Sequence, residues 1–114
     1  MKSKKYSKNV SGKVMHTQIV FHTKYNRNML KGEIQRRAMK IIYDILRENG
    51  CSEIAIGVYP NHVRLLFAYP PTLAIAKLMG RVKGKSSYLL RKEFPELEKQ
   101  CPKALWAPKY GMVY

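Results

Sequence analysis

The chain has 114 residues, enough for one domain that buries roughly two thirds of its unfolded surface. Its two cysteines, Cys51 and Cys101, have neither metal-binding spacing nor a disulfide-rich pattern, and no secretory signal is present, so we expect reduced thiols in a cytoplasmic protein. No apolar run approaches the roughly 18 residues that a transmembrane helix needs, so we expect no such helix in this sequence.

The net charge is the strongest compositional indication of a partner. The chain carries 22 Lys and Arg against 7 Asp and Glu, a formal charge of +15, and residues 54–92 include no acidic side chain. Such a charge costs stability through self-repulsion and is usually retained because the partner is a polyanion. We expect nucleic acid rather than an anionic membrane, because no basic helix has a large aromatic face. A merely solvated basic surface is the alternative.

The first part of the chain predicts an arm, a strand and a helix. Residues 1–13 are basic and polar and predict a flexible arm, which either follows a phosphate backbone or acts as a solubilising tail. Residues 14–23 predict an interior strand, with His16 and His22 on one face. A hydrogen-bonded structural role is the alternative to metal ligation for these histidines. Residues 31–49 follow, with apolar residues at helical spacing.

A hairpin is predicted next, at the start of the acid-free residues 54–92. Residues 54–59 and 62–69 are rich in β-branched and aromatic residues, and the pair Pro60-Asn61 between them favours a turn. Side chains alternate along a strand, so His62 and Arg64 point to the same face. The hairpin therefore presents a histidine beside an arginine.

A second amphipathic helix is predicted from an N-cap at Thr72 to about residue 94. Gly80 and Gly84 each cost such a helix about 1 kcal/mol relative to alanine. We expect either a neighbouring strand or a phosphate to approach them closely, with ordinary helix packing as the alternative. One side of this helix forms a cationic stripe that contains an aromatic ring, which is plausible for tracking a nucleic-acid backbone. The stripe consists of Lys77, Arg81, Lys85, Tyr88 and Lys92.

The remaining residues complete the fold. Residues 95–102 predict a charged connection, and 109–113 predict a short last strand. The order of strand, helix, strand, strand, helix, strand predicts an α+β, ferredoxin-like βαββαβ fold. Residues 14–114 would then form a single domain, with a four-stranded antiparallel sheet and two helices on one face.

A series of short motifs runs from about residue 15 to residue 110. They are His16, Val20-Phe21, Lys24-Tyr25, Arg27, Gly50, Pro60-Asn61-His62-Val63-Arg64-Leu65-Leu66, Pro70-Pro71, Lys83-Gly84-Lys85-Ser86-Ser87, Arg91-Lys92-Glu93-Phe94-Pro95, Leu105-Trp106-Ala107-Pro108 and Tyr110. In their order and spacing they resemble the TnpA-type HUH transposases of the smallest bacterial and archaeal insertion sequences.

The resemblance implies a single-tyrosine enzyme that works as a homodimer and recognises subterminal hairpins in single-stranded DNA. In such enzymes a tyrosine hydroxyl attacks the scissile phosphate and forms a covalent phosphotyrosine. A divalent ion, Mg or Mn, is held by two histidines one residue apart and polarises that phosphate. Alternate strand residues lie about 6.6 Å apart on one face, so two imidazoles can converge on one ion.

Two departures from the family pattern affect this chemistry. His62 matches the first metal ligand, but the second position is Arg64, whose guanidinium offers no lone pair and repels a cation. The metal site is therefore expected to be damaged, unless Arg64 itself supplies the positive charge on the phosphate. The family's nucleophilic tyrosine and a ligand glutamine lie on a helix after the last strand, and the sequence stops before such a helix. Tyr114 is the remaining candidate nucleophile, but it falls in or just after the last strand.

We therefore predict a transposase-family domain that binds DNA and does not cleave it by itself. The predicted DNA contacts are Arg64, Lys77, Arg81, Lys83, Lys85, Tyr88 and Lys92. An RNA-binding module of similar topology is the alternative, although residues 62–69 lack the Gly-aromatic signature of RNA-recognition strands. A small assembly protein whose sheet only dimerises is a third possibility.

Overall fold

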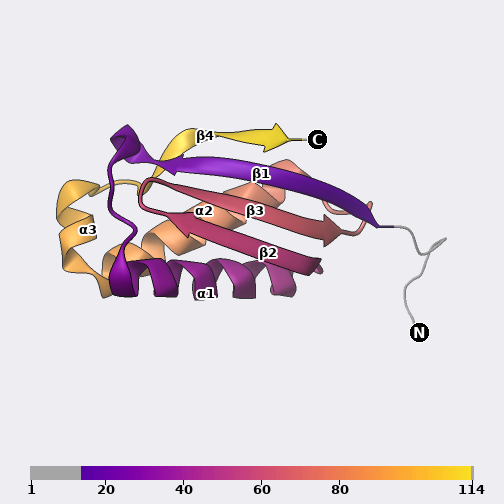
Figure 1. The fold of residues 1–114 in the computed structure, drawn as a ribbon, viewed down its shortest axis with the longest axis horizontal. Coiled ribbons are helices and arrows are strands. Elements are labelled where there is room, and N and C mark those ends of the chain that lie inside the picture. The colour runs from indigo at the N-terminus through magenta and orange to yellow at the C-terminus, as the bar shows by residue number, and fades with distance from the viewer. Residues whose placement is uncertain (1–13, 114) are drawn as a thin grey trace.

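The computed structural model describes residues 14–113. They form a four-stranded antiparallel sheet, with strand order β2-β3-β1-β4 and the long helices α1 and α2 on one face (Figure 1). The elements are β1 (Met15–Thr23), a 3-10 turn (Lys24–Asn26), α1 (Gly32–Glu48), β2 (Ser52–Tyr59), β3 (His62–Tyr69), α2 (Ile75–Glu93), α3 (Pro95–Gln100) and β4 (Trp106–Val113). The predicted ferredoxin-like fold is confirmed. The predicted arm, residues 1–13, and Tyr114 lie outside the described residues.

Alternation along the two central strands separates a buried face from an open face. In β1, Ile19 and Phe21 are fully buried, whereas His22 is exposed. β1 is an interior strand as predicted, since it pairs with β3 on one side and β4 on the other. The core between sheet and helices includes Ile19, Phe21, Ala38, Ile42, Ile45, Val63, Leu65, Phe67, Leu78, Val82 and Leu90. None of the described helices is long and apolar enough to cross a membrane.

The predicted hairpin is confirmed, and it brings His62 opposite Tyr59. β3 has the predicted bounds, but β2 begins at Ser52 rather than at residue 54. The pairing register shifts between Ser52 and Ala55, where Glu53 adopts a positive φ of 50°. Because of this bulge, β2 begins two residues before the alternating residues from which the strand is predicted.

α1 ends where the sequence predicts, at a glycine with left-handed backbone. Gly50 has φ +85°, and its N–H donates to the carbonyl of Arg47, while the N–H of Cys51 donates to the carbonyl of Leu46. This pair of hydrogen bonds is the Schellman motif, which satisfies carbonyls left open at a helix end.

The start of α2 differs from the prediction. Thr72 is not its N-cap, because the helix begins at Ile75 and Ala74 occupies the cap position without a side-chain hydrogen bond. The chain first turns through a hydrogen bond from the N–H of Leu73 to the carbonyl of Pro70. Because of this turn, α2 begins at Ile75, later in the chain than the predicted cap at Thr72 implies.

The expected close approach of a strand to the α2 glycines is wrong. No protein atom lies within 4 Å of a Cβ built on Gly80 or Gly84. Both glycines are exposed. They leave the helix surface open instead of making room for a neighbouring strand.

The segment after α2 also differs from the prediction of a simple connection. Residues 95–100 form α3, with Pro95 at its start and Leu97 buried. Proline is favoured at the first helical position, because the N–H that it lacks would have no helical partner there. β4 begins at Trp106 rather than at residue 109. Pro108 is tolerated because β4 lies at the edge of the sheet.

Two buried serines of α2 hold the start of β4 in place. The indole Nε1–H of Trp106 donates to Ser86 Oγ at 2.9 Å, and the N–H of Leu105 donates to Ser87 Oγ at 2.9 Å. The Trp106 ring also meets Phe21 edge to face, with centroids 4.8 Å apart. These contacts fix β4 relative to both layers and define the surface between α2 and β4.

Candidate nucleic-acid interface

The predicted cationic stripe belongs to α2 and is called the α2 stripe. It lies on the side of the helix that faces away from the core. All five of its side chains are exposed, whereas Leu78, Val82 and Leu90 on the opposite side are fully buried. A helix rises 1.5 Å per residue, so the stripe extends over about 22 Å. It is a straight row of positive charge with Tyr88 near one end, a shape that suits a polyanionic backbone.

Part of the stripe contacts the end of α1. Arg81 donates to Asn49 Oδ1, and Lys85 Nζ lies 3.7 Å from a carboxylate oxygen of Glu48. Lys92 Nζ lies 5.5 Å from the centroid of the Tyr88 ring and 3.3 Å from its hydroxyl. These contacts are exposed and contribute little to stability, so the side chains can exchange them for phosphate oxygens.

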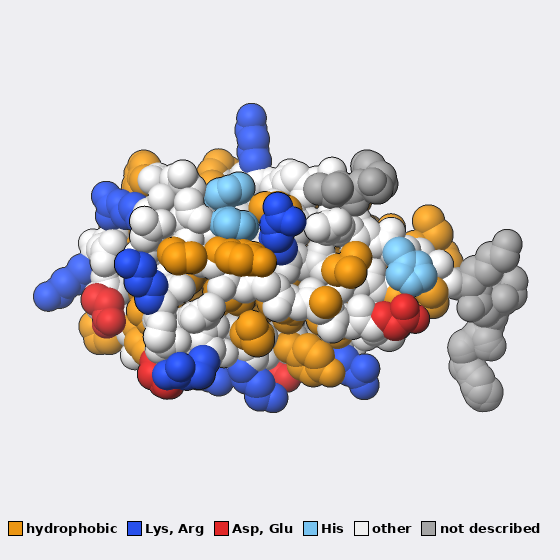
Figure 2. All heavy atoms as spheres, viewed as in Figure 1, with side chains coloured by type: hydrophobic (Ala, Val, Ile, Leu, Met, Phe, Trp, Pro, Cys, Tyr) orange, Lys and Arg blue, Asp and Glu red, His pale blue; other side chains and the backbone are white. Residues whose placement is uncertain are grey.

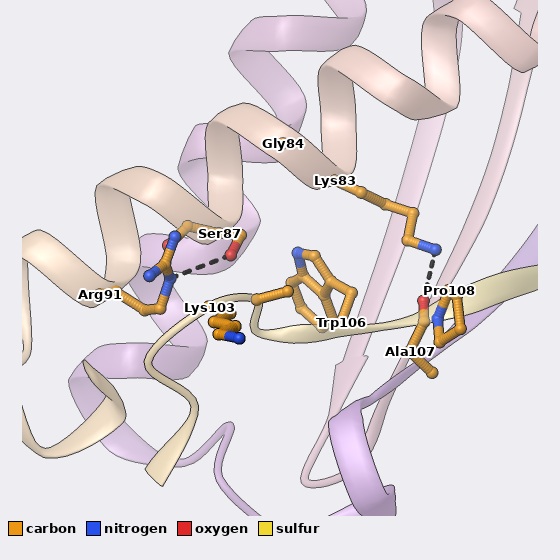
Figure 3. Close-up of a pocket in the computed structure, with 9 residues that line it drawn as sticks. Lys83, Gly84, Ser87, Arg91, Lys103, Trp106, Ala107 and Pro108 are labelled. Carbon is orange, nitrogen blue, oxygen red and sulfur yellow. Dashed lines mark hydrogen bonds between the residues drawn. The ribbon is translucent and has the colours of Figure 1, made fainter. Parts of the chain in front are cut away.

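Lys83 lies apart from the stripe, on the side of α2 that faces β4. Its Nζ donates to the carbonyl of Ala107 at 2.5 Å and lies 3.4 Å from that of Lys109 (Figure 3). Burial lowers the pKa of Lys83. Its ammonium group is therefore engaged by the backbone of β4, while the outward stripe is presented to solvent.

A pocket of about 300 Å³ lies beside Lys83, between α2 and the segment that enters β4 (Figure 3). Its lining residues are Lys83, Gly84, Ser87, Arg91, Lys103, Ala104, Trp106, Ala107 and Pro108. Three of them are cationic and none is acidic. Arg91 is held by the Ser87 hydroxyl and by the carbonyl of Pro102. The pocket thus combines an apolar wall with positive charge, which suits an anionic group that carries a flat or apolar part.

The open face of the sheet carries a different cluster, made of His22, Tyr59, His62 and Arg64. His22 pairs with His62 across β1 and β3, with ring centroids 5.3 Å apart, and Tyr59 stacks on His62 at 4.6 Å. Arg64 is exposed on the same face. Figure 2 shows histidine side chains next to one another on this face, with a basic side chain beside them.

The hydrogen bonds around His62 determine which of its ring nitrogens carries the proton. Asn61 donates through Nδ2 to Asn26 Oδ1, and its own Oδ1 lies 2.8 Å from Nδ1 of His62. An amide oxygen can only accept, so Nδ1 is the donor and Nε2 keeps its lone pair. Burial, with the charges of His22 and Arg64, lowers the pKa of His62, so the neutral ring persists to lower pH.

The divalent ion implied by the resemblance does not fit positions 62 and 64. His62 can offer one lone pair, but Arg64 offers none and adds a positive charge on the same face. Within residues 14–113, no three His, Cys, Asp or Glu side chains lie close enough together to hold a metal ion. The damage to this site stays a prediction.

The predicted contact residues fall into separate groups. Lys77, Arg81, Lys85, Tyr88 and Lys92 share the outer face of α2, Lys83 lines the pocket, and Arg64 lies on the open face of the sheet. Their role in DNA binding stays a prediction. The sequence does not indicate that Arg91 and Lys103 line one pocket, although Arg91 lies in the acid-free residues 54–92. It also did not pair His22 with His62, because that contact depends on strand register.

Comparison with known proteins places the chain in a family. Residues 11–114 match the family model described as "Transposase IS200 like". The chain is 33% identical over 96 residues to the ISDra2 transposase TnpA of Deinococcus radiodurans, an alignment that covers 83% of this chain and 69% of that protein. It is 29% identical over 93 residues to the IS200 transposase of Salmonella typhimurium, which covers 81% of this chain and 61% of the relative.

Two solved structures share this fold. A transposase structure from Deinococcus radiodurans superposes with a TM-score of 0.84 at 26% identity, covering 100% of this chain and 85% of that one. A REP-associated tyrosine transposase bound to a REP hairpin shares the fold at 13% identity, with a TM-score of 0.57 over 97% of this chain and 61% of that one. From the family match and these similarities, the chain belongs to the IS200-like transposase family.

Proposed function

We propose that this chain is a DNA-binding domain of an IS200-like transposase, that it recognises hairpins in single-stranded DNA, and that it does not cleave DNA by itself. The α2 stripe carries the proposal, because it presents basic side chains in a row on the outer face of the helix. Its basic side chains all belong to residues 54–92, which include no acidic residue. A polyanion bound there meets attraction along the whole row.

The comparisons support DNA as the polyanion. The family is that of transposases, and one protein of the same fold is described in complex with a REP hairpin. The homodimer and the cytoplasmic location expected from the resemblance are part of the same proposal. The five side chains of the α2 stripe are exposed in the single chain and are therefore available to a folded DNA strand.

The absence of cleavage follows from Arg64. Metal-assisted attack on a phosphate needs an ion that polarises the phosphate oxygen. At the second family position this chain places a guanidinium, which cannot ligate a cation. Without that ion the chain would still bind DNA through the α2 stripe, but it would not cleave the bound strand.

A binding assay with three labelled oligonucleotides tests the first half of the proposal. Fluorescence anisotropy should show tighter binding of a DNA hairpin with single-stranded flanks than of a fully paired duplex or an RNA hairpin of the same sequence. Preference for RNA would instead support the RNA-binding module. Binding that vanishes at moderate salt without preference for the hairpin would support the assembly protein, and no binding at low salt would exclude all nucleic-acid functions.

A cleavage assay tests the second half. The purified chain is incubated with the hairpin oligonucleotide and Mg²⁺ or Mn²⁺, and products are separated on a denaturing gel. We expect neither a nicked strand nor a protein that migrates with covalently attached DNA. A covalent adduct would show that the chain is a competent enzyme despite Arg64.

A further inference from the structure

We propose that the pocket between α2 and the segment that enters β4, called here the α2–β4 pocket, is a subsite for one nucleotide unit. The base packs on the apolar wall of the pocket, and the phosphate binds to Arg91 and Lys103. None of the five residues of the α2 stripe lines this pocket, so the proposal does not depend on DNA binding by the stripe. The nucleotide unit is either a free mononucleotide or an unpaired position of a strand.

The size and the wall of the pocket suit a planar ring. Its volume of about 300 Å³ lies at the lower end of the range for small-ligand sites. Trp106, Ala107 and Pro108 supply apolar surface on the β4 side (Figure 3). Stacking and apolar contact are open to every base, because each base has a π-face. The wall therefore favours binding of a base with little selectivity among bases.

The wall is held in place by hydrogen bonds within the protein. The indole Nε1–H of Trp106 donates to Ser86 Oγ at 2.9 Å, and the ring meets Phe21 edge to face. The N–H of Leu105 donates to Ser87 Oγ at 2.9 Å. A ligand that binds to an ordered wall avoids the entropy cost of ordering it.

Arg91 is positioned to bind the phosphate. Its Nε donates to the hydroxyl and to the carbonyl of Ser87, both at 3.2 Å, and its Nη1 donates to the carbonyl of Pro102 at 2.7 Å. A guanidinium has five N–H donors in one plane. These contacts fix that plane and use two of the five donors. The remaining donors can form the paired hydrogen bonds by which arginine binds phosphate.

The other two cations of the pocket have different roles. Lys103 is exposed, and it comes from the segment before β4 rather than from α2. Its ammonium group can therefore approach a phosphate on Arg91 from a second element. Lys83 is engaged by the carbonyl of Ala107, so it holds the wall and adds positive charge. None of the residues that line the pocket is acidic, so its charge favours an anion.

Gly84 leaves the pocket open to solvent. It is exposed, it lines the pocket, and no protein atom lies within 4 Å of a Cβ built on it. A glycine inside a helix lowers stability relative to alanine. Close approach of a ligand to the backbone is one use that offsets this cost, and a nucleotide in the pocket would make such an approach.

Isothermal titration of the full chain with thymidine 5′-monophosphate tests the subsite, and the fluorescence of Trp106, the single tryptophan, reports on the wall. We expect one nucleotide per chain, a change in this fluorescence, and affinity at least about tenfold higher than for thymidine or inorganic phosphate alone. Absence of mononucleotide binding would overturn the proposal. Equal affinity for inorganic phosphate would overturn it too, because the wall would then bind no base.

Charge variants test the phosphate contacts. Arg91→Gln and Lys103→Gln should each weaken nucleotide binding by about tenfold, because each removes a charged hydrogen-bond donor. Lys99→Gln is the control, since Lys99 is an exposed lysine of α3 that does not line the pocket. It should bind within about twofold of wild type. Equal weakening by the control would show that net charge alone attracts the nucleotide.

Two glycine variants separate a blocked pocket from a loss of structure. Gly84→Leu places a helix-favouring side chain at the pocket. Nucleotide binding should be lost while the melting temperature is kept or raised, a combination that unfolding cannot produce. Gly80→Leu is the matched control, because Gly80 is equally exposed and open but lines a separate hollow with Met79 and Tyr110. It should keep the wild-type affinity, and equal binding by Gly84→Leu and wild type would overturn the proposal.

The hairpin oligonucleotide of the DNA-binding assay distinguishes the two sources of the nucleotide. Weaker hairpin binding by Gly84→Leu than by Gly80→Leu would show that the pocket receives an unpaired nucleotide of the strand. Equal hairpin binding by the two variants would assign the pocket to a free mononucleotide. The mononucleotide titration contains no hairpin, so failure of the subsite and failure of the proposed function are separate results.

Discussion

Replacing Lys77 and Lys92 with alanine tests directly whether α2 follows a DNA backbone. The two residues lie at opposite ends of the α2 stripe and are exposed. Neither forms an ion pair with an acidic residue among the described residues, in contrast to Lys85, which lies near Glu48. Their removal should change phosphate contacts with little effect on the fold, because exposed substitutions usually alter stability by less than about 0.5 kcal/mol.

The size of the effect follows from the number of basic side chains in the stripe. Each phosphate contact with single-stranded DNA contributes about −0.7 to the slope of log K against log salt concentration, so the four basic residues of the stripe give about −2.8. The double variant retains two contacts and a slope of about −1.4. Between about 50 and 200 mM salt, the part of the affinity that the stripe contributes should then fall about 50-fold for wild type and about 7-fold for the variant.

Fluorescence anisotropy with a labelled hairpin oligonucleotide, repeated over a salt series, measures both slopes. The matched control is Arg36→Ala with Lys40→Ala, which removes two exposed charges from α1 that pair with Glu33 and Asp44. The control should keep the wild-type slope. If the stripe variant and the control give the same slope, net charge alone attracts the DNA and α2 is not the contact surface.

Three further changes test the packing around the interface. Gly80→Ala should raise the free energy of unfolding in urea by up to about 1 kcal/mol, because the glycine is exposed in a helix with no atom near the new Cβ; a loss of stability would contradict this. Ser86→Ala leaves the buried indole N–H of Trp106 without its acceptor and should cost about 1–3 kcal/mol, measured through the fluorescence of this single tryptophan; an unchanged midpoint would refute the contact. Burial raises the pKa of Cys51 to about 11 from its ordinary value of 9.0, so its contribution to stability is complete below pH 9 and is lost as the pH rises toward 11. Cys51→Ala should flatten the stability profile in that range, and an unchanged slope there would contradict it.

The sequence predicts the sheet and both long helices because their signals are local. Alternation in β3 gives its bounds, and Gly50 marks the end of α1 through a backbone conformation that favours glycine. The position of α3 is also signalled locally, by Pro95 at its first residue and Glu96 in its first turn. The charged composition of residues 95–102 favours an exposed connection over a helix, so the sequence does not predict α3.

β4 illustrates a signal that depends on a strand's place in the sheet. Pro108 argues against a strand in the centre of a sheet but not at its edge, where one side of the strand needs no partner. Whether β4 is an edge strand is a property of the topology, and its start at Trp106 further depends on contacts with Ser86 and Ser87. A prediction based on neighbouring residues begins the strand too late.

The spacing of residues in the sequence does not predict the contact between His22 and His62 on the open face of the sheet. His22 and His62 are 40 residues apart in the sequence and meet only because β1 pairs with β3 in one register. A shift of that register by two residues would place His22 opposite Arg64 instead. The sequence shows which face each side chain occupies, and the register decides which of them touch.

The arrangement of the charges is compatible with the proposal that the chain binds DNA without cleaving it. Arg64 lies on the open face of the sheet, while the α2 stripe lies beyond the opposite face, on the far side of the helix layer. A strand held along α2 therefore gains nothing from the side chain at position 64 and loses nothing when that side chain changes. In the proposed function, a change at position 64 alters the open face of the sheet and leaves the charged row on the other side intact. The proposed DNA-binding surface and the proposed metal position are thus physically separate in this fold, and each can be tested by substitutions that do not touch the other.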